Sequence, residues 1–437
     1  MKIAFFTPLN PMKSGISDFS EELLPELAKY MKIDLFIDDY KPTNRSIIDN
    51  FKIYNIKEFY KDDIRKQYDE YIYHIGNNEK YHEKIVECAI KYPGIVELHD
   101  ISLHHMLAAT TLAKGNKNKY IEEMEYCHGR IGRDTAIKFI NGEIPPPWET
   151  DSLKFTVNKR IIDSSKAIIV HSDFAEQMIK GICNKPIITI LLHTADIEEN
   201  YIEMQRNARD KLGIRQDELL ISSFGFVTRS KRVEQILYSL KKVKDSGVNF
   251  KYLIVGEVPK GSGLKNRICD LGLKNNVEVK GYVDLDLFKE YMKAIDICMN
   301  LRYPIQGETS ASLHRALGMG KVVFVSDIGP FKDYPDDVVI KIPIDHDEID
   351  CIYKNIIKVF SHKDFCKKIR RNAIQFSKKF CSLESNSLRY YNFIRCINRE
   401  QYFEENISNI FADKLFELSI NDFKVIRALC EKFSNIV

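Results

Sequence analysis

The most informative stretch of the chain lies in its second half and reads Asn300-Leu301-Arg302-Tyr303-Pro304-Ile305-Gln306-Gly307-Glu308-Thr309-Ser310-Ala311-Ser312-Leu313-His314-Arg315-Ala316-Leu317-Gly318-Met319-Gly320-Lys321. A strand is expected to lead into it, turns are expected at Pro304 and Gly307, and small hydroxyl-bearing residues then start a helix that ends at two glycines. A helix start has unpaired backbone N–H groups and a partial positive charge, so small residues there let a phosphate or a sugar hydroxyl approach closely. The stretch therefore predicts an anion-binding turn and helix start from Gly307 to Leu317. A plain helix cap at Ser310 or Ser312 is the alternative.

Short apolar runs alternate with longer amphipathic stretches around this segment, which is typical of strand and helix units on a parallel sheet. A first set of strands is expected at residues 3–6, 33–37, 70–75, 95–98, 167–170 and 187–192. A second set is expected at residues 219–224, 251–255, 277–280, 297–300, 322–325 and 338–342. The polar stretch 194–200 separates the two sets and predicts an interdomain linker. Two such sheets would place a ligand crevice at the carboxyl ends of their strands.

Three parts follow from this pattern. Residues 1–195 are expected to form one Rossmann-like domain and residues 196–382 a second, which suits the length of 437 residues. Residues 383–437 are expected to form helices that pack back across the domains. Aromatic and aliphatic residues recur there at helical spacing, namely Tyr390, Phe393, Ile394, Phe403 and Ile407.

Composition excludes several classes of protein. The chain has 65 Lys and Arg against 62 Asp and Glu, and the net charge of +3 argues against a nucleic-acid partner. The first apolar run is too short for a signal peptide, and no run of about 18 apolar residues follows, so a cytoplasmic protein is expected. The ten cysteines, from Cys88 to Cys430, form no CxxC pair or zinc-type cluster, and we interpret them as reduced structural thiols.

The segment 301–317, together with Val325-Ser326-Asp327-Ile328-Gly329, resembles the donor-binding signature of retaining glycosyltransferases of family 4. The arrangement of Arg-Tyr-Pro, Gly-Glu-Thr-Ser and Arg-Ala-Leu is most similar to members that act on bacterial cell-surface polysaccharides. The resemblance covers most of both domains and implies the α/β GT-B fold, in which two doubly wound domains face a central cleft. It also implies transfer of a sugar from a nucleotide-diphosphate sugar to an acceptor hydroxyl with retention of anomeric configuration, in the synthesis of a cell-surface glycan or glycoconjugate. The first domain would face the acceptor and the second would bind the donor.

The same resemblance implies roles for individual residues. Glu308 would meet the donor sugar, and Lys231 would bind the diphosphate and stabilise the leaving group as negative charge develops. Relatives often carry an arginine where Phe226 stands, and Arg229 either replaces it or is a solvated side chain. A second glutamate of many relatives binds the ribose, but Arg315 occupies its position. The predicted donor-binding set is Gly15, Arg229, Lys231, Gly281, Tyr282, Glu308, Thr309, Ser310, Ala311, Ser312 and Arg315.

The resemblance also assigns two glycine-bearing loops. Gly15, in the loop after the first strand, would allow close packing against the donor phosphates, with an ordinary strand-to-helix turn as the alternative. Gly281 and Tyr282 match the loop that faces the nucleobase. The run 255–263 is not a P-loop, because no Lys-Ser or Lys-Thr follows its last glycine.

Titratable residues gather after the strand predicted at residues 95–98. His99 corresponds to a histidine near the reacting sugar, so the predicted catalytic set is His99, Lys231 and Glu308. His104 and His105 are interpreted as structural histidines. Metal binding is not expected, because a strand-to-loop run rarely folds so that all its side chains converge. The His171-Ser172 and Gly76-Asn77 pairs match elements that line the cleft in the family.

The predicted partners are a nucleotide-sugar donor and a glycan, lipid-linked or protein acceptor, without a metal or cofactor. Two basic spots, at residues 116–119 and 367–371, either touch an anionic membrane at its inner face or form solvated surfaces. The alternative functions are a catalytically silent nucleotide-sugar-binding scaffold and a GT-B epimerase.

Overall fold

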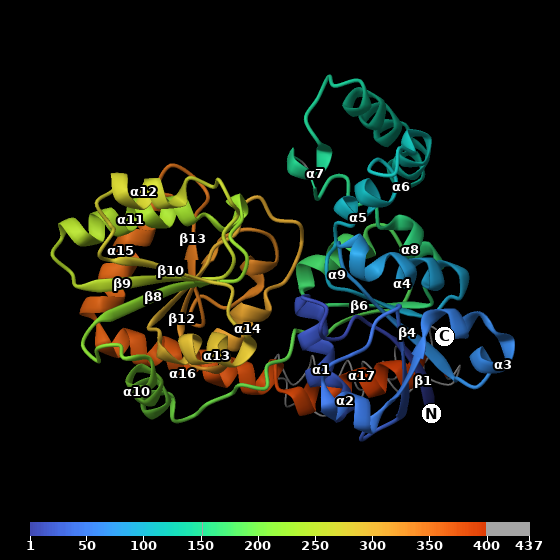
Figure 1. Cartoon of the computed structure of the whole chain (residues 1–437), viewed down its shortest axis with the longest axis horizontal. Coiled ribbons are helices and arrows are strands. Elements are labelled where there is room, and N and C mark those ends of the chain that lie inside the picture. The colour runs from blue at the N-terminus through green and yellow to red at the C-terminus, as the bar shows by residue number, and fades with distance from the viewer. Residues whose placement is uncertain (151, 399–437) are drawn as a thin grey trace, which may run out of the picture.

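Two parallel β-sheets organise the chain in the computed structural model, which describes residues 1–150 and 152–398 (Figure 1). The first sheet has seven strands in the order β3-β2-β1-β4-β5-β6-β7, and the second has six in the order β10-β9-β8-β11-β12-β13. The strands are β1 (Lys2–Phe6), β2 (Lys32–Ile37), β3 (Lys52–Asn55), β4 (Glu70–Ile75), β5 (Ile95–Leu98), β6 (Ala167–Val170), β7 (Ile187–Thr189), β8 (Leu219–Phe224), β9 (Phe250–Val255), β10 (Val277–Gly281), β11 (Ile297–Asn300), β12 (Val322–Ser326) and β13 (Ile340–Ile342).

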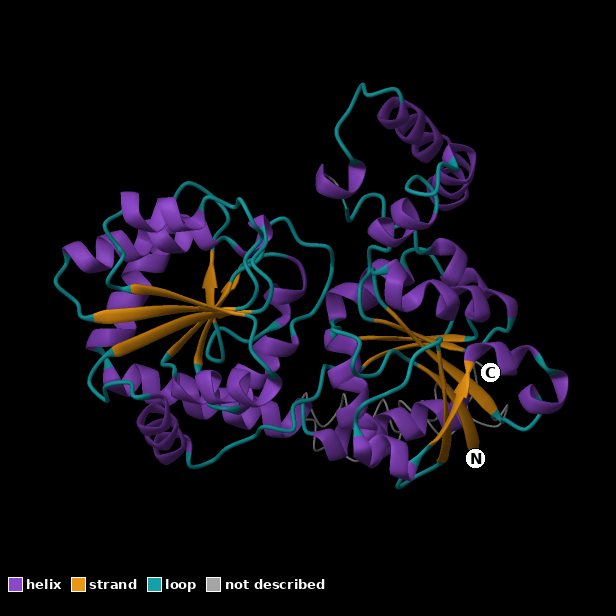
Figure 2. Cartoon of the chain, in the orientation of Figure 1, coloured by secondary structure: helices purple, strands orange, loops and turns teal. Residues whose placement is uncertain are grey.

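Helices cover both faces of each sheet (Figure 2). They are α1 (Gly15–Leu27), α2 (Arg45–Asn50), α3 (Asp62–Arg65), α4 (Glu79–Lys91), α5 (His104–Thr110), α6 (Lys117–Ile140), α7 (Pro147–Thr150), α8 (Lys159–Ser164), α9 (Asp173–Lys180), α10 (Tyr201–Leu212), α11 (Val233–Asp245), α12 (Leu264–Asp270), α13 (Leu285–Ala294), α14 (Ala311–Gly318), α15 (Glu348–Ser361), α16 (Lys363–Phe380) and α17 (Leu383–Ile397). Single 3₁₀ turns occur at Ile56–Tyr60, Arg229–Lys231 and Gly329–Asp333. The expected α/β fold of two doubly wound sheets with C-terminal helices is therefore confirmed.

Each of the twelve predicted strands is present, but the first sheet has one more. Strand β3 was missed because it is a short edge strand whose residues are only partly buried, so it lacks a continuous apolar run. The last predicted strand of the first sheet is shorter than expected and ends at Thr189.

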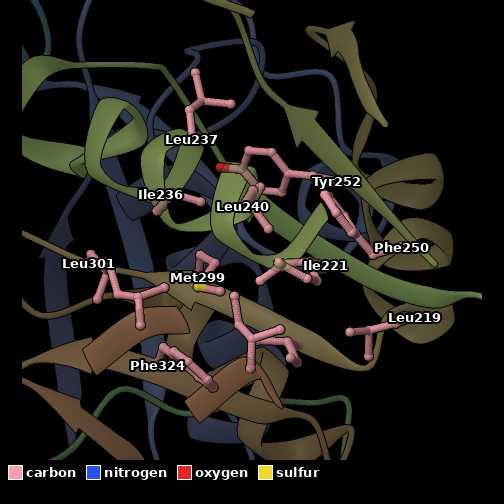
Figure 3. Packing of buried hydrophobic residues seen from close by; sticks show 14 of the residues in the cluster. Leu219, Ile221, Ile236, Leu237, Leu240, Phe250, Tyr252, Met299, Leu301 and Phe324 are labelled. Atoms are coloured by element: carbon pink, nitrogen blue, oxygen red, sulfur yellow. The ribbon is translucent and has the colours of Figure 1, made fainter. Parts of the chain in front are cut away.

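The core of the second domain shows why these strands form. Inward-facing residues of β8, β9, β11 and β12 pack against the apolar face of α11, as Figure 3 shows for Ile221, Tyr252 and Leu240. These three side chains are fully buried. Burying such a side chain contributes about 1.5–3 kcal/mol, so this layer holds the loops at the strand ends in fixed positions.

Two elements depart from the plain two-sheet plan. Helices α5, α6 and α7 lie between β5 and β6, and α6 and α7 project away from the first sheet (Figure 1). Helix α17 returns to the first domain, where it packs on α1 and buries Tyr390. The predicted helical residues Phe403 and Ile407 lie outside the described residues, as does the rest of 399–437. No helix in the described part of the chain has both the length and the apolar character needed to span a membrane.

Candidate functional site

The carboxyl ends of strands from both sheets meet around one cleft, with a cavity volume of about 400 Å³. Loops after β1, β4 and β5 supply its first-domain wall, with Gly15, Asn77 and His99 among the lining residues. The loop after β11 supplies Gln306 and Thr309 from the second domain. Part of the stretch 300–321 therefore faces the first domain across this cleft.

The loop before α14 is docked on the first domain by its backbone. Gly307 has a φ of 78°, and a Cβ on this residue would lie 2.8 Å from the Cβ of Ile101. Both the positive φ and the close approach require glycine here. Ser152 Oγ donates to the carbonyl of Ile305 at 2.9 Å, and the Ser102 N–H donates to the carbonyl of Gln306 at 3.3 Å.

The start of α14 combines a structural cap with backbone N–H groups that have no intrahelical partner. Ser310 is the N-cap residue, and its Oγ accepts from the Leu313 N–H at 3.4 Å and donates to Asn300 Oδ1 at 3.0 Å. Ser312 Oγ lies 3.0 Å from Ser310 Oγ. The cap interpretation therefore applies to Ser310, whereas Thr309 and Ala311 line the cleft. The remaining N–H groups of the first turn lack intrahelical partners and can meet an anion.

Glu308 and Arg302 form a charged pair in the loop between β11 and α14. Glu308 Oε2 accepts from the Gln306 N–H at 2.7 Å, which holds the carboxylate in place, and its Oε1 lies 3.7 Å from Arg302 Nε. The backbone of Arg302 is held in turn, because its main-chain N–H donates to Ser326 Oγ at 2.8 Å. Arg302 belongs to the Arg-Tyr-Pro element noted in the sequence, but it was not among the predicted site residues.

Lys231 lies beside Arg302 because β8 and β11 are neighbouring strands. Its Nζ donates to the carbonyl of Phe224, and burial together with the positive charge of Arg302 holds its pKa well below the usual range. A bound diphosphate would supply the missing negative charge at this position. Arg229 is exposed, and within the described residues its side chain makes no hydrogen bond or ion pair. Phe226 is also exposed, so no cation occupies its position.

Two glycine-bearing loops border the same cleft. A Cβ on Gly15 would meet no protein atom within 4 Å, so packing within the protein does not require glycine there. A ligand in the cleft is a reason for a glycine at this position. Gly281 ends β10 with a φ of 73°, and the next residue, Tyr282, is exposed with Lys13 Nζ 4.6 Å from its ring centroid. Lys13 and Tyr282 thus join the two domains across the cleft.

Arg315 points away from the cavity and pairs with two carboxylates. Its guanidinium donates to Glu22 Oε1 and to Asp196 Oδ2, each at 2.6 Å. Glu22 is on α1 of the first domain and Asp196 is in the segment that joins the domains, so this cluster connects three parts of the chain. Lys289 Nζ lies 3.3 Å from Asp196 Oδ2. A role for Arg315 in donor binding stays a prediction, since its partners here are carboxylates.

The Arg315 cluster is expected to stabilise the contact between the two domains. Arg315→Met should lower the midpoint of thermal unfolding, because it leaves two carboxylates facing each other with only Lys289 as a counter-charge. Glu22→Gln should lower the free energy of unfolding less in the Arg315→Met background than in the wild type. The difference between the two effects should be about 1–3 kcal/mol. Calorimetry of the wild type, the two single variants and the double variant measures this coupling. Additive effects of the two substitutions would contradict the assignment.

His99 is held from below by a buried carboxylate, Glu97 of β5. Glu97 accepts from Tyr390 at 2.8 Å, and the Nε2 atoms of His74, His99 and His171 lie 3.0, 3.3 and 3.2 Å from its oxygens. Burial alone would raise the pKa of Glu97, but the surrounding histidines, His74 foremost, hold it well below the usual range. Burial and the neighbouring His171 lower the pKa of His99, so this ring is neutral.

The histidine-rich run after β5 does not converge on one point. His104 is buried between the Phe155 carbonyl and Tyr120, as expected of a structural histidine, whereas His105 is partly exposed and lines the cleft. Ligand atoms of His74, Glu97 and His99 lie within 4.8 Å of one another, a spacing that metal sites also use. The histidines lie close enough to Glu97 for ionic contact, and metal independence stays a prediction.

Asp100 is a cleft residue that sequence reasoning missed, although it follows His99 directly. Its Oδ2 accepts from the Asn77 N–H at 2.8 Å. Burial, and to a lesser degree the negative charge of Glu308, raise the pKa of Asp100 to about 6. Asn77 also links the two domains, because its amide nitrogen lies 3.4 Å from Gln306 Oε1.

The remaining predicted elements have clear places. Ser172 is the N-cap of α9, and the cysteines among the described residues are free thiols. In the basic spot at 367–371, Lys367, Lys368 and Arg371 border a second surface hollow, whereas Arg370 turns inward and donates to the Gly320 carbonyl at 2.7 Å. The other basic spot lies at the start of α6, on the projecting segment of the first domain.

Comparison with known proteins adds to this geometry. Residues 204–376 match the family described as Glycosyl transferases group 1, a match that covers the second domain. No curated protein matches the sequence.

Solved structures match over both domains. Sucrose-phosphate synthase from Thermosynechococcus elongatus is 14% identical with a TM-score of 0.64, covering 90% of this chain and 98% of that chain. HepE of Anabaena in complex with UDP is 13% identical with a TM-score of 0.61, and the match covers 90% of this chain and 100% of that chain. WaaG, a glycosyltransferase involved in lipopolysaccharide biosynthesis, is 13% identical with a TM-score of 0.58, and the match covers 90% of this chain and 99% of that chain. These likenesses establish the GT-B fold.

Proposed function

We propose that this chain is a glycosyltransferase that moves a sugar from a nucleotide-diphosphate sugar to an acceptor hydroxyl, with retention of anomeric configuration. One observation carries the proposal: Glu308, Arg302 and Lys231 lie together next to the start of α14, on the second-domain side of the cleft, whose wall includes Thr309 and Ala311. That wall belongs to the domain that matches Glycosyl transferases group 1. His99 faces it from the first domain.

The donor would bind with its diphosphate between Lys231, Arg302 and the first turn of α14. Two side-chain cations and unpaired N–H groups suit the charge of a nucleoside diphosphate. Glu308 would accept hydrogen bonds from the sugar hydroxyls, since Gln306 fixes its position. Tyr282 would lie beside the nucleobase. HepE was solved with UDP and with UDP-glucose, so uridine nucleotides are the first donors to test.

In the reaction, the acceptor oxygen would form a bond to the anomeric carbon on the face from which the phosphate departs. The bond from that carbon to the phosphate oxygen breaks, and its electron pair stays on the diphosphate. The hydroxyl proton passes to the departing diphosphate. Lys231 and the N–H groups after Glu308 lower the energy of this step, because they face the oxygens on which charge develops.

A nucleoside diphosphate is expected to stabilise the protein. At a ligand concentration about 100 times the dissociation constant, binding contributes about 2.7 kcal/mol, which corresponds to a rise of several degrees in the unfolding midpoint. Thermal unfolding with UDP, uridine and inorganic pyrophosphate separates the contributions of base and phosphate. Equal midpoints with and without every nucleotide and nucleotide sugar tested would argue against a donor site.

A nucleotide-sugar-binding scaffold without turnover is the second candidate. Two observations favour it, since Phe226 brings no cation to the donor wall and Arg315 is bound to carboxylates. A thermal shift with UDP-glucose but no release of UDP, even over days and with acceptors present, would support the scaffold. An epimerase would instead convert the sugar of the donor without any acceptor.

The biological setting is also a proposal. WaaG is involved in lipopolysaccharide biosynthesis, and the sequence resembles enzymes of cell-surface polysaccharides, so a cell-surface glycan or glycoconjugate is the proposed product. The cytoplasmic location and the contact with an inner membrane face stay predictions.

A further inference from the structure

Two hydrogen-bond acceptors flank Gly76 in the first-domain wall of the cleft. A Cβ on Gly76 would lie 2.6 Å from Ile16 Cδ1, 3.0 Å from His82 Nε2 and 3.3 Å from Asp100 Oδ2, so Ile16 packs against this glycine and both polar groups lie next to it. All four residues line the cleft. They belong to the wall opposite the proposed donor site.

Asp100 keeps one carboxylate oxygen available. The Asn77 N–H occupies Oδ2, whereas Oδ1 has no hydrogen-bond partner in residues 1–150 and 152–398. The backbone contact fixes the direction of the carboxylate. A group with an O–H or N–H in the cleft could therefore complete its hydrogen bonding.

His82 presents a second acceptor. Its Nδ1 lies 3.1 Å from the carbonyl oxygen of His74, so Nδ1 carries the proton and donates. Burial lowers the pKa of His82 to about 4, and the ring is neutral at pH 7. Its Nε2 therefore holds a lone pair beside Gly76. Two neighbouring acceptors of this kind suit a ligand with several hydroxyl groups.

The rest of the pocket suits a polar ring. The side-chain amide of Asn77 lies next to both His105 and Gln306 in the lining of the pocket. Tyr81 adds an aromatic ring to the same lining. The volume of about 400 Å³ lies within the range of about 300–1,000 Å³ typical of small-ligand sites. A sugar combines several hydroxyls with a ring of modest size.

We propose that this wall binds a sugar ring of the acceptor, and that Asp100 Oδ1 accepts the hydrogen bond of the hydroxyl that becomes glycosylated. The inference rests on the proposed function and names its acceptor class. Asp100 orients the hydroxyl so that its oxygen forms the new bond to the anomeric carbon. The bond from that carbon to the diphosphate breaks, and the hydroxyl proton passes to the diphosphate with the leaving electron pair.

The charge of Asp100 gives the step a pH dependence. The titratable groups around it are Glu308 across the cleft, His82 on α4, His99 and His171 after neighbouring strands, and His105 on α5 with Glu149 beyond it. The ionised carboxylate is the better acceptor, and the pKa of Asp100 is about 6. Transfer should therefore increase as the pH rises through about 6 and fall below it.

Asp100→Asn tests this proposal, with Asp49→Asn on the exposed face of α2 as the matched control. The variant should lower kcat/KM for the acceptor by about 100-fold and lose the acid limb near pH 6, whereas the affinity for UDP should stay within about twofold. Thermal unfolding verifies that each protein is folded. Free oligosaccharides and lipid-linked sugars form the two acceptor arms, and a response in either arm identifies the source of the ring.

Several results would overturn the inference. An unchanged acceptor kcat/KM with the acid limb intact would remove Asp100 from this role. A loss confined to the donor KM would place Asp100 on the donor instead. Transfer only to acceptors without sugars would also refute it while leaving the proposed glycosyltransferase function standing. A wild-type protein that binds and consumes no nucleotide sugar would refute the proposed function itself.

Discussion

Lys231→Ala is expected to lower kcat for sugar transfer by about 10²–10³-fold, the largest effect of any cation in the cleft. Lys231 lies in the turn after β8, next to Arg302, and in the proposed reaction the negative charge of the departing diphosphate would develop beside both. The reduction should be smaller for UDP binding than for kcat, because the charge on the bridging oxygen is greatest in the transition state. Steady-state release of the nucleoside diphosphate measures both values.

Arg229→Ala is the matched control for Lys231. Arg229 lies two residues earlier, carries the same charge and is exposed without a side-chain partner in the described part of the chain. Its loss should change kcat by less than about fivefold. If the two variants lose activity equally, Arg229 is a donor ligand and the inward position of Lys231 does not decide catalysis.

Glu308→Gln is expected to lower kcat/KM for the nucleotide sugar by about 10²-fold while leaving the affinity for the nucleoside diphosphate nearly unchanged. The substitution keeps the shape of the side chain but removes the charged acceptor held by Gln306 and facing Arg302. This contrast separates recognition of the sugar from recognition of the diphosphate. Isothermal titration with UDP and kinetics with the nucleotide sugar give the two quantities.

Glu203→Gln on the exposed surface of α10 controls for loss of a carboxylate in the same domain. It should leave both quantities unchanged. Equal weakening of UDP and nucleotide-sugar binding by Glu308→Gln would mean that the carboxylate orders the loop rather than the sugar.

The fold was largely predictable because its signals are local. Each strand of the second sheet is a short apolar run between polar turns, and burial on both faces explains runs such as Leu219–Phe224. Strand β3 escaped prediction because an edge strand needs little apolar sequence. The start of α14 was predictable as well, since the cap residue and the turn at Gly307 lie within one segment.

The partners of the site residues were less predictable because they come from distant parts of the chain. Glu22 and Arg315 are 293 positions apart, and so are Glu97 and Tyr390. A motif read along the sequence assigned Arg315 to a ligand, but the fold supplies two carboxylates first. Asp100 was missed because its burial and its contact with Asn77 depend on the packing of β4 against β5.

Proton nuclear magnetic resonance of a single reaction mixture can show whether this cleft transfers a sugar from a nucleotide sugar to an acceptor. The mixture would contain the protein, a nucleotide sugar and sugar acceptors, and the spectra would follow the anomeric protons and the released nucleotide together. We expect the nucleoside diphosphate and a new glycosidic bond to appear in equal amounts, with the anomeric configuration of the donor retained in the product. A product of inverted configuration, or a donor that stays intact with every acceptor, would contradict it.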